Sequence, residues 1–412
     1  MSAELVVVGG GQAGFALVAK LRKMGDGRAI TLISNERQLP YQRPPLSKKY
    51  LLGELELDRL LFRPQRWYDD NAVSLVLNTN VLSIDTVRET IELDDGRTIP
   101  YANLALATGS YAVRLPTELG GDLDGVYAIR STSDVDRMSK EFIAGRTVLI
   151  VGGGYIGLEA AAVASKLGLR VIVVEREDRI LNRVAARSTS DYFYRLHAAH
   201  GVRILQATGI VELMESNGHV DGARLTDGTE IHVDFVICGI GIRPHQQLAA
   251  ESGLKVSDGI VVDKPCRASN SKIVAAGDCA CFPYRETFIR LESVQNGVDQ
   301  GEAAAVTLYG DEVDYRPYPW FWSEQFDVKL QIAGLSAGFD RSCTRPGLRS
   351  DSESTWYFKE DRLLAVDAMN DSTSYLVASR LLKMGVNPRY DQISDPNFNL
   401  KGLLKNDHSK RD

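Results

Sequence analysis

The sequence lacks the patterns that mark several protein classes. Its five cysteines are odd in number and include no C-x-x-C pair, so neither a disulfide framework nor a zinc ribbon is indicated. No apolar run approaches the roughly 20 residues that cross a bilayer, and no basic segment with a cleavage site precedes the first strand-like run. We therefore expect a cytoplasmic protein that does not associate with membranes.

Several catalytic patterns are also missing, and the overall charge is modest. The six histidines show no H-x-x-x-H spacing, and no Ser/His/Asp set, metal cluster or carboxylate pair stands out. The net charge of −6 gives no reason to expect nucleic acid as a partner. The 412 residues, 44% hydrophobic and 25% charged, have the composition of a globular protein with two or three domains.

The most informative feature present is a glycine turn after an apolar strand. LVVVGGGQAG, over residues 5–14, matches the pattern G-x-G-x-x-G and is followed by an expected helix over 12–24. In this pattern the first glycine permits a tight turn, the second lets a pyrophosphate approach the backbone, and the third lets helix pack on strand. The helix N-terminus then favours an anion. The three glycines are Gly9, Gly11 and Gly14.

The turn recurs in TVLIVGGGYIGLE, over 147–159, and an acidic residue follows the next strand in each copy. Glu36 lies 22 residues past Gly14, after a strand expected over 29–34, and can accept hydrogen bonds from an adenosine ribose. Glu175 lies 18 residues past the last glycine of the second copy and favours the free 2′-hydroxyl of NAD over NADP. Arg176 leaves a 2′-phosphate possible. The glycines of this copy are Gly152, Gly154 and Gly157.

Two basic residues follow the first nucleotide fold in the segment LPYQRPPLSKK, over 39–49. Three prolines keep this segment out of regular helix until Leu46, from which a helix can start. A rigid segment that carries Arg43 and Lys48 suggests positive charge directed at a bound cofactor. The alternative is a solvated loop with basic residues on the surface.

Further segments complete the expected fold. Short strands over 73–106 end in small residues, Ala107, Thr108, Gly109 and Ser110, which let backbone come close to a ligand. Residues 121–133 indicate a connecting loop, and a strand is expected over 234–244. Asp-Gly and Asn-Gly pairs predict hairpins around residues 95, 217 and 227.

The last third of the chain contains two more candidate sites. Asp278 directly follows a strand and a glycine, before a helix expected over 293–309, where it can either bond a cofactor or cap a turn. From residue 320 the pattern indicates an α+β unit with two or three strands and a closing helix. Its cluster Trp320-Phe321-Trp322 suits either a core corner or a binding surface.

Seven segments in this order resemble the FAD-dependent NADH:ferredoxin reductases of oxygenase systems. They are VVVGGGQAG, YQRPPLSK, LALATGS, VGGGYIGLE, AAGDCA, ESVQNG and FWSEQFDVKLQIAG. The resemblance implies an α/β, glutathione-reductase-like fold with two Rossmann-type dinucleotide-binding domains and a C-terminal α+β domain. It implies an FAD-binding domain over 1–112 and 246–319, an inserted NAD(H)-binding domain over 113–245, and a C-terminal domain over 320–412.

The resemblance also implies roles for single residues. Lys48 is expected beside flavin N5 and paired with Glu159, while Tyr155 covers the isoalloxazine until nicotinamide displaces it. Trp322 is expected near the opposite flavin surface, towards the acceptor protein. The other residues expected to bind FAD are Gly9, Gly11, Gly14, Glu36, Arg43, Ala107, Thr108, Asp278 and Val294, and those for NADH are Gly152, Gly154, Gly157 and Glu175.

The implied activity is hydride transfer from NADH to FAD and single-electron transfer to a [2Fe–2S] ferredoxin, by a monomer or homodimer. Residues 38–52 contain no cysteine, in contrast to disulfide reductases of this fold. Alternatives are a rubredoxin or monodehydroascorbate reductase, or an NADH-sensing protein like apoptosis-inducing factors. An acidic ferredoxin would favour a basic rim. Candidates for it are Arg63, Arg66, Arg285, Arg290, Lys329 and Lys383, and the alternative for each of them is an ordinary solvated surface residue.

Overall fold

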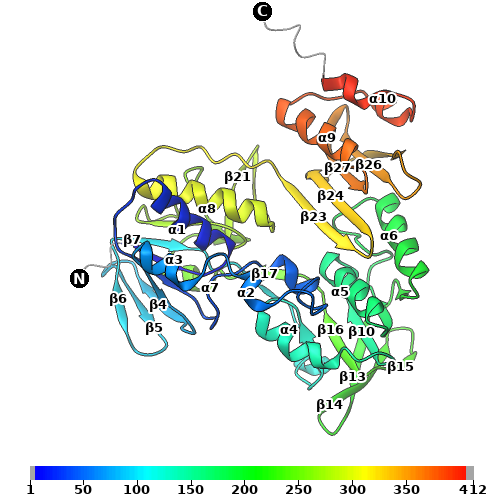
Figure 1. Cartoon of the computed structure of the whole chain (residues 1–412), viewed down its shortest axis with the longest axis horizontal. Coiled ribbons are helices and arrows are strands. Elements are labelled where there is room, and N and C mark those ends of the chain that lie inside the picture. The colour runs from blue at the N-terminus through cyan, green and yellow to red at the C-terminus, as the bar shows by residue number, and fades with distance from the viewer. Residues whose placement is uncertain (1–4, 405–412) are drawn as a thin grey trace, which may run out of the picture. The chain divides into compact units, whose positions relative to one another are not determined.

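The computed structural model describes residues 5–404, and these residues form two compact units (Figure 1). Neither unit is continuous in sequence. Unit 1 comprises residues up to 45, 55–111 and 242–317, and unit 2 comprises 46–54, 112–241 and 318 onwards. Unit 2 thus groups the expected NAD(H)-binding segment with the C-terminal segment, and the three-domain division of the chain stays a prediction.

Unit 1 is built around a five-stranded parallel sheet whose central strand, β1 (Leu5–Val8), leads into the first glycine turn. The strand order is β20-β7-β1-β2-β3. All four residues of β1 are buried, as a strand covered on two faces requires. The other strands are β2 (Ile30–Ile33), β3 (Val73–Val76), β7 (Asn103–Leu106) and β20 (Ile273–Ala275).

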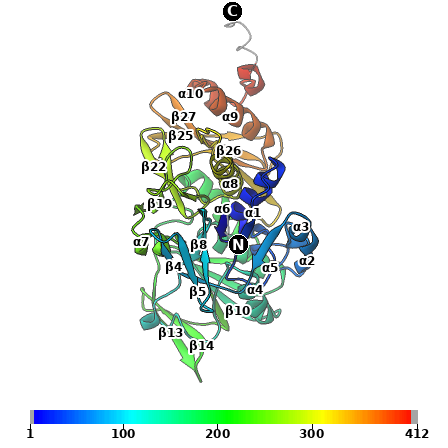
Figure 2. The same cartoon turned by 90° about the vertical axis from the view of Figure 1, so that its left-hand side faces the viewer.

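Two helices of unit 1, α1 (Gln12–Lys23) and α8 (Val294–Tyr309), run side by side (Figure 1, Figure 2). They can approach closely because Gly301 has no side chain. A Cβ at this position would lie 2.5 Å from the Ala13 carbonyl oxygen. The expected helices over 12–24 and 293–309 are therefore confirmed. Shorter helices are α2 (Leu57–Leu60), α3 (Gln65–Asp70) and α7 (Gln247–Glu251).

Three small sheets complete unit 1. The hairpin around residue 95 is confirmed, since β5 and β6 flank it in the antiparallel sheet β4-β5-β6. A second sheet has the order β18-β19-β21-β22, and β8 pairs with β17. Their bounds are β4 (Val81–Asp85), β5 (Thr90–Leu93), β6 (Thr98–Pro100), β8 (Ser110–Ala112), β17 (Ile242–Pro244), β18 (Val256–Ser257), β19 (Gly259–Val261), β21 (Ala280–Tyr284) and β22 (Thr287–Ile289).

Unit 2 repeats the parallel sheet around the second glycine turn. The strand order is β12-β11-β10-β16-β9, and all neighbouring pairs are parallel. β11 (Arg170–Val174) has the expected bounds, and α5 (Tyr155–Lys166) and α6 (Arg187–Ala199) follow β10 and β11. The other strands are β9 (Val126–Ala128), β10 (Thr147–Val151), β12 (Arg203–Leu205) and β16 (Phe235–Cys238).

The hairpins expected around residues 217 and 227 are confirmed by the antiparallel sheet β13-β14-β15. β13 (Ile210–Ser216) and β14 (His219–Leu225) form a long ribbon at the lower end of Figure 2, and β15 (Glu230–His232) completes the sheet.

Three sequence expectations for the part of the chain before residue 320 were wrong. Residues 121–133 are not only a loop, because β9 forms the edge of the second sheet and α4 (Thr132–Met138) begins there with Ser131 as its N-cap. No α-helix starts at Leu46, since Pro44–Ser47 forms one 3-10 turn. The strand expected over 234–244 is split into β16 and β17 around Gly239 and Gly241, where Gly241 has φ +111°.

The C-terminal segment of unit 2 is richer in strands than expected. Five antiparallel strands form a sheet of order β23-β24-β27-β26-β25, covered on one face by α9 (Ser372–Met384). A short helix, α10 (Tyr390–Ser394), follows α9, so the expectation of two or three strands and one closing helix was wrong. The strands are β23 (Trp320–Gln325), β24 (Val328–Gly334), β25 (Arg341–Pro346), β26 (Glu353–Lys359) and β27 (Arg362–Met369).

Candidate dinucleotide sites and the Lys48–Glu159 pair

The three glycines of the first turn have different surroundings. A Cβ at Gly9 would lie 2.1 Å from the Ala107 carbonyl oxygen, and one at Gly14 would lie 2.0 Å from the Gly9 carbonyl oxygen. A Cβ at Gly11, in contrast, would meet nothing within 4 Å. Gly9 and Gly14 are therefore required by backbone packing, whereas Gly11 leaves open the approach to the N-terminus of α1, where an anion is favoured.

The second turn divides the same roles among its glycines. A Cβ at Gly152 would lie 2.5 Å from the Gly239 carbonyl oxygen, and one at Gly157 would lie 2.2 Å from the Gly152 carbonyl oxygen. At Gly154 the nearest atom would be 3.9 Å away. The middle glycine again faces open space at the start of a helix, α5.

Each turn lies where the strand order of its sheet reverses. β1 lies between β2 and β7, and β10 lies between β11 and β16. Ligands of open parallel sheets bind at the carboxyl ends of the strands at such a point. Ala107 and Gly239, the residues that follow β7 and β16, border the two turns. The residues present in each sheet therefore fit a bound dinucleotide.

Glu36, Tyr41 and Arg43 form one cluster in unit 1. The Glu36 carboxylate accepts hydrogen bonds from the Tyr41 hydroxyl at 2.5 Å and from Nη2 of Arg43 at 2.6 Å. Burial alone would lower the pKa of Arg43, but Glu36, Tyr41 and Asp278 together raise it above its ordinary value. The basic residue expected to face a cofactor is thus held beside the carboxylate expected to bond the ribose.

Asp278 is held by a residue that sequence reasoning did not select. Oδ2 of Asp278 accepts a hydrogen bond from the Ser110 hydroxyl at 2.7 Å. Thr108, two residues earlier, donates through Oγ1 to the His245 carbonyl oxygen at 2.7 Å. Ser110 belongs to the run of small residues after β7. Its position directly beside Ala107 and Thr108, which were expected to bind FAD, could have indicated that it takes part in the site.

Val294 opens α8, the helix that packs on α1. Ser293 is the N-cap of α8, because its hydroxyl accepts from the Asn296 amide at 3.1 Å. One turn further on, Oε1 of the buried Gln300 accepts from the Gly277 amide at 2.8 Å. α8 therefore anchors the turn that carries Asp278, so Val294 and Asp278 belong to one connected part of unit 1.

Lys48 and Glu159 form an ion pair within unit 2, as expected, in which Glu159 is buried and Lys48 is partly buried. Nζ of Lys48 lies 2.6 Å from Oε2 of Glu159, and their side chains are 16% and 5% exposed. Oε2 also accepts from the Ser47 hydroxyl at 2.6 Å, and Oε1 accepts from the Ser323 hydroxyl at 2.7 Å. The two serines were not singled out from the sequence, although they lie in YQRPPLSK and FWSEQ.

Tyr155, the first residue of α5, packs against the aromatic cluster of β23. Its ring centroid lies 5.0 Å from that of Phe321, and Phe321 lies 6.4 Å from Trp322. Among residues 5–404 the buried Tyr155 hydroxyl has no hydrogen-bond partner. Burial raises the pKa of this hydroxyl well above its ordinary value, and the nearby Asp367 and Tyr357 add to the increase.

Glu175 is fixed against the second glycine turn. Its Oε2 accepts from the Gly153 amide at 2.8 Å, and its Oε1 accepts from the Glu177 amide at 2.9 Å. Arg176 has an 86% exposed side chain and lies 3.6 Å from Glu177. The carboxylate is therefore placed beside the turn, whereas the arginine extends into solvent.

Cys238, Cys266, Cys279, Cys281 and Cys343 are all buried free thiols, and burial raises the pKa of each. Within residues 5–404 no group of His, Cys, Asp or Glu is arranged to hold a metal ion. No helix in the same range is long and apolar enough to span a bilayer.

Arg290 is the least suitable of the candidates for a basic rim. Its side chain is 10% exposed and forms ion pairs with Glu292 and with Asp258, the latter at 3.3 Å. Arg285 and Lys383 lie over the rings of Tyr284 and Tyr318, at 5.1 and 5.2 Å from their centroids. Arg63, Arg66, Arg285 and Arg290 belong to unit 1, and Lys329 and Lys383 belong to unit 2.

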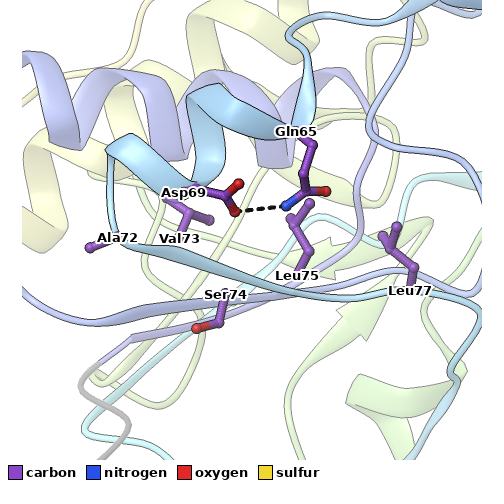
Figure 3. A pocket seen from close by; sticks show the side chains of 7 residues that line it. All are labelled: Gln65, Asp69, Ala72, Val73, Ser74, Leu75 and Leu77. Carbon is purple, nitrogen blue, oxygen red and sulfur yellow. Dashed lines mark hydrogen bonds between the residues drawn. The ribbon is translucent and has the colours of Figure 1, made fainter.

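A hollow on unit 1 lies between α3 and β3 (Figure 3). Nε2 of Gln65 donates to Oδ1 of Asp69 at its rim, at 2.9 Å. None of the residues expected to bind a cofactor lines it. The lining residues are Gln65, Asp69, Ala72, Val73, Ser74, Leu75 and Leu77.

Comparison with known proteins agrees with this geometry. Residues 3–301 match the family model of pyridine nucleotide-disulphide oxidoreductases, and residues 320–404 match that of the reductase C-terminal domain. Rhodocoxin reductase of Rhodococcus erythropolis is 39% identical over 97% of this chain and 93% of its own length. The ferredoxin–NAD(+) reductase component of the anthranilate 1,2-dioxygenase system of Burkholderia cepacia is 37% identical over 98% of this chain and all of its own.

A solved structure, the covalent complex of putidaredoxin reductase with putidaredoxin, contains a chain with the same fold. The TM-score is 0.95 at 32% identity, and the match covers 99% of each chain. The present chain belongs to the family of pyridine nucleotide-disulphide oxidoreductases. It is a flavoprotein oxidoreductase that uses FAD and NADH, and the fold class and the two cofactors expected from the sequence are confirmed.

Proposed function

We propose that this chain is an NADH:ferredoxin reductase that passes electrons singly to a [2Fe–2S] ferredoxin serving a heme monooxygenase or a ring-hydroxylating dioxygenase. The observation that carries the proposal is the buried Lys48–Glu159 pair at the first turns of α5. It belongs to a chain whose five cysteines are buried thiols with raised pKa values, so no thiol is suited to relay electrons.

The residues at the two glycine turns would hold the cofactors. In unit 1 the open position at Gly11 and the N-terminus of α1 would receive the FAD diphosphate, with Glu36 at the adenosine ribose. In unit 2 the open position at Gly154 and the carboxylate of Glu175 would receive NADH. Arg43, Ala107, Thr108, Asp278 and Val294 would complete the FAD site.

The electron chemistry is supplied by bound FAD, which can accept two electrons as hydride and release them one at a time. Lys48 would place a positive charge where negative charge develops during reduction. Glu159 would hold the Lys48 side chain in one position through its 2.6 Å contact. Tyr155 would cover the site until nicotinamide displaces its ring, and Trp322 would face the acceptor protein.

Similar proteins support the choice of ferredoxin as the acceptor. The Burkholderia protein is named as a ferredoxin–NAD(+) reductase of a dioxygenase system, and the matched crystal structure is a complex with putidaredoxin. We also infer that residues 1–112 and 246–319 form the FAD-binding domain, 113–245 the NADH-binding domain, and 320–412 a C-terminal α+β domain. Residues 1–4 and 405–412 lie outside the described range.

Rubredoxin is the second candidate acceptor. A rubredoxin–NAD(+) reductase of Pseudomonas putida is 35% identical, over 89% of this chain. Ferredoxin is preferred because the dioxygenase component aligns with 98% of this chain and all of its own length, which includes the C-terminal sheet.

Steady-state oxidation of NADH, with cytochrome c as the final acceptor, tests the proposal. We expect turnover to depend strongly on an added [2Fe–2S] ferredoxin and to fall when NADPH replaces NADH. Faster turnover with rubredoxin would select the second candidate. Equally slow turnover with either protein, together with a persistent long-wavelength absorption band after NADH addition, would support an NADH-sensing role.

A further inference from the structure

A chain of buried side chains extends from α6 to the Lys48–Glu159 pair, entirely within unit 2. It consists of His197 on α6, Gln325 and Ser323 on β23, and Glu159 on α5. The first three residues are 0% exposed and Glu159 is 4% exposed. Burying a polar group without a hydrogen-bond partner costs free energy, so side chains buried this deeply are expected to bond one another.

Each contact in this chain is within hydrogen-bonding distance. Nε2 of His197 lies 2.9 Å from Oε1 of Gln325, and Nε2 of Gln325 lies 3.2 Å from Oγ of Ser323. Oγ of Ser323 then lies 2.7 Å from Oε1 of Glu159. Two side chains, Gln325 and Ser323, thus connect His197 to Oε1 of Glu159, the carboxylate oxygen that does not contact Lys48.

The donors in this chain all point towards the carboxylate. Because a carboxylate oxygen can only accept, the Ser323 hydroxyl donates to Glu159, and Ser323 must accept from the Gln325 amide nitrogen. The Gln325 oxygen then accepts from Nε2–H of His197. The opposite amide orientation would have the oxygen of Gln325 compete with Glu159 for the single hydroxyl proton of Ser323.

The environment of His197 agrees with this direction. Its Nδ1 is buried and has no hydrogen-bond partner among residues 5–404, so a proton there would be left unsatisfied. Burial lowers the pKa of His197 to about 4, and the imidazole is therefore neutral at pH 7. A neutral ring with its single proton on Nε2 is the form that can donate to Gln325.

The backbone fixes the geometry of the chain. Ser323 and Gln325 alternate along β23 and share its buried face, while Glu324 between them is exposed. At the following turn the rings of His197 and His200 pack on Phe326, at centroid distances of 5.0 and 3.7 Å. These ring contacts hold α6 against the end of β23. They therefore fix the position of His197, where the row of hydrogen bonds begins.

We propose that His197, Gln325 and Ser323 are positioning residues that orient the Glu159 carboxylate and thereby hold the Lys48 ammonium in place. Ser323 occupies Oε1 of Glu159, which leaves Oε2 to Ser47 and Lys48. Loss of the chain frees the carboxylate to rotate and weakens its hold on the ammonium. The importance of this effect for flavin reduction rests on the proposed function of Lys48.

The accessibility of the Lys48 amine tests the proposal without flavin or an acceptor. The apoprotein is labelled with a trace amount of acetic anhydride, and mass spectrometry compares acetylation of Lys48 with that of its exposed neighbour Lys49. We expect Ser323→Ala and His197→Phe to raise the Lys48-to-Lys49 ratio about fivefold, the change expected for the loss of one hydrogen bond. Glu159→Gln, which removes the carboxylate itself, should give the largest rise in the Lys48-to-Lys49 acetylation ratio.

Two further variants separate positioning from general disruption. His197→Gln restores an N–H donor and should return the ratio to that of the wild type. His200→Phe keeps a ring on Phe326 but lies outside the chain, and it should leave the ratio unchanged. Equal ratios in all variants, or an equal rise with His197→Gln, would overturn the proposal. If His197→Phe does not fold, Ser323→Ala at the other end of the chain provides the same test.

Stopped-flow reduction of the FAD-loaded variants provides a second measurement. The limiting rate of reduction should fall with Ser323→Ala and His197→Phe, while the Kd for NADH stays constant, because the nucleotide-binding residues are unchanged. A change in Kd alone would contradict a positioning role. Since the labelling experiment needs neither NADH nor ferredoxin, its outcome is independent of whether the wild type reduces ferredoxin.

Discussion

Oε2 of Glu159 accepts hydrogen bonds from Nζ of Lys48 and Oγ of Ser47, each at 2.6 Å, across sequence separations of 111 and 112 residues. The carboxylate is almost completely buried. Removal of one partner of a buried ion pair leaves an uncompensated charge, which costs about 3–5 kcal/mol. Ser47 and Lys48 thus connect residues 46–54 to α5, and they place an ammonium group beside the second nucleotide fold.

The first prediction concerns Lys48. Lys48→Ala should slow reduction of bound FAD by NADH about 100-fold, because the proposed role of Lys48 is to place one preorganised charge where the flavin is reduced. The amount of FAD bound per chain should stay unchanged. Stopped-flow absorbance measures the rate, with Lys49→Ala as the matched control. An unchanged rate of reduction would remove Lys48 from the mechanism.

Nucleotide preference should depend on Glu175. Its carboxylate is fixed by the amides of Gly153 and Glu177, where it can bond a free 2′-hydroxyl and repel a 2′-phosphate. Glu175→Ala should lower the ratio of kcat/KM for NADH over NADPH about tenfold. Arg176→Ala is the control, because its side chain extends into solvent. Equal ratios for the wild type and Glu175→Ala would show that another residue reads the ribose.

Alanine substitutions at two glycines of the first turn should affect different properties of the protein. Gly11→Ala should leave thermal stability unchanged but weaken FAD binding at least about tenfold, since the added methyl group enters the open space at the helix N-terminus. Gly14→Ala should destabilise the protein itself, because its Cβ would lie 2.0 Å from the Gly9 carbonyl oxygen. Differential scanning fluorimetry and FAD titration of the apoproteins check both results. Unchanged FAD affinity in Gly11→Ala would place the diphosphate elsewhere.

A buried carboxyl group should make stability depend on pH. Asp367 on β27 is 0% exposed, and its Oδ2 accepts from the hydroxyl groups of Thr189, at 2.9 Å, and Tyr357. Burial raises the pKa of Asp367 to about 6, from 3.8 in the unfolded chain. The folded state therefore binds this proton more tightly, and its contribution to stability is lost as pH rises from about 4 through 6.

Asp367→Asn should remove this dependence. The difference in unfolding free energy between pH 4 and pH 7 should change by about 3 kcal/mol, which corresponds to a pKa difference of about two units. Urea denaturation at each pH measures it, and Asp361→Asn is the control because Asp361 is fully exposed. The same pH dependence in Asp367→Asn and the wild type would show that Asp367 titrates normally.

Local sequence signals predicted the nucleotide-binding elements well. β11 has the expected bounds, and α1 and α5 follow the two glycine turns, because a buried strand and a glycine turn each leave a strong pattern in adjacent residues. The hairpins at Asn-Gly and Asp-Gly pairs were predictable for the same reason. Family resemblance, and not spacing, indicated the Lys48–Glu159 pair.

Short strands stabilised by distant partners were not predictable. β9 has three residues and forms only because β16 provides an edge to pair with. The C-terminal sheet has its fifth strand because β25 pairs with β26, which in turn pairs with β27, and the RSCTRP sequence of β25 has little strand pattern of its own. Tertiary pairing overrides weak local preference in such elements.

By itself the sequence determined that this protein has two dinucleotide folds, uses FAD and NADH, and has no cysteine in residues 38–52. Only the tertiary structure decided how Glu159 is held, because Ser47, Ser323, Gln325 and His197 come from three separate segments. The physical reason is that a glycine turn encodes its backbone conformation locally. A buried hydrogen bond between distant side chains exists only once folding excludes water from around them.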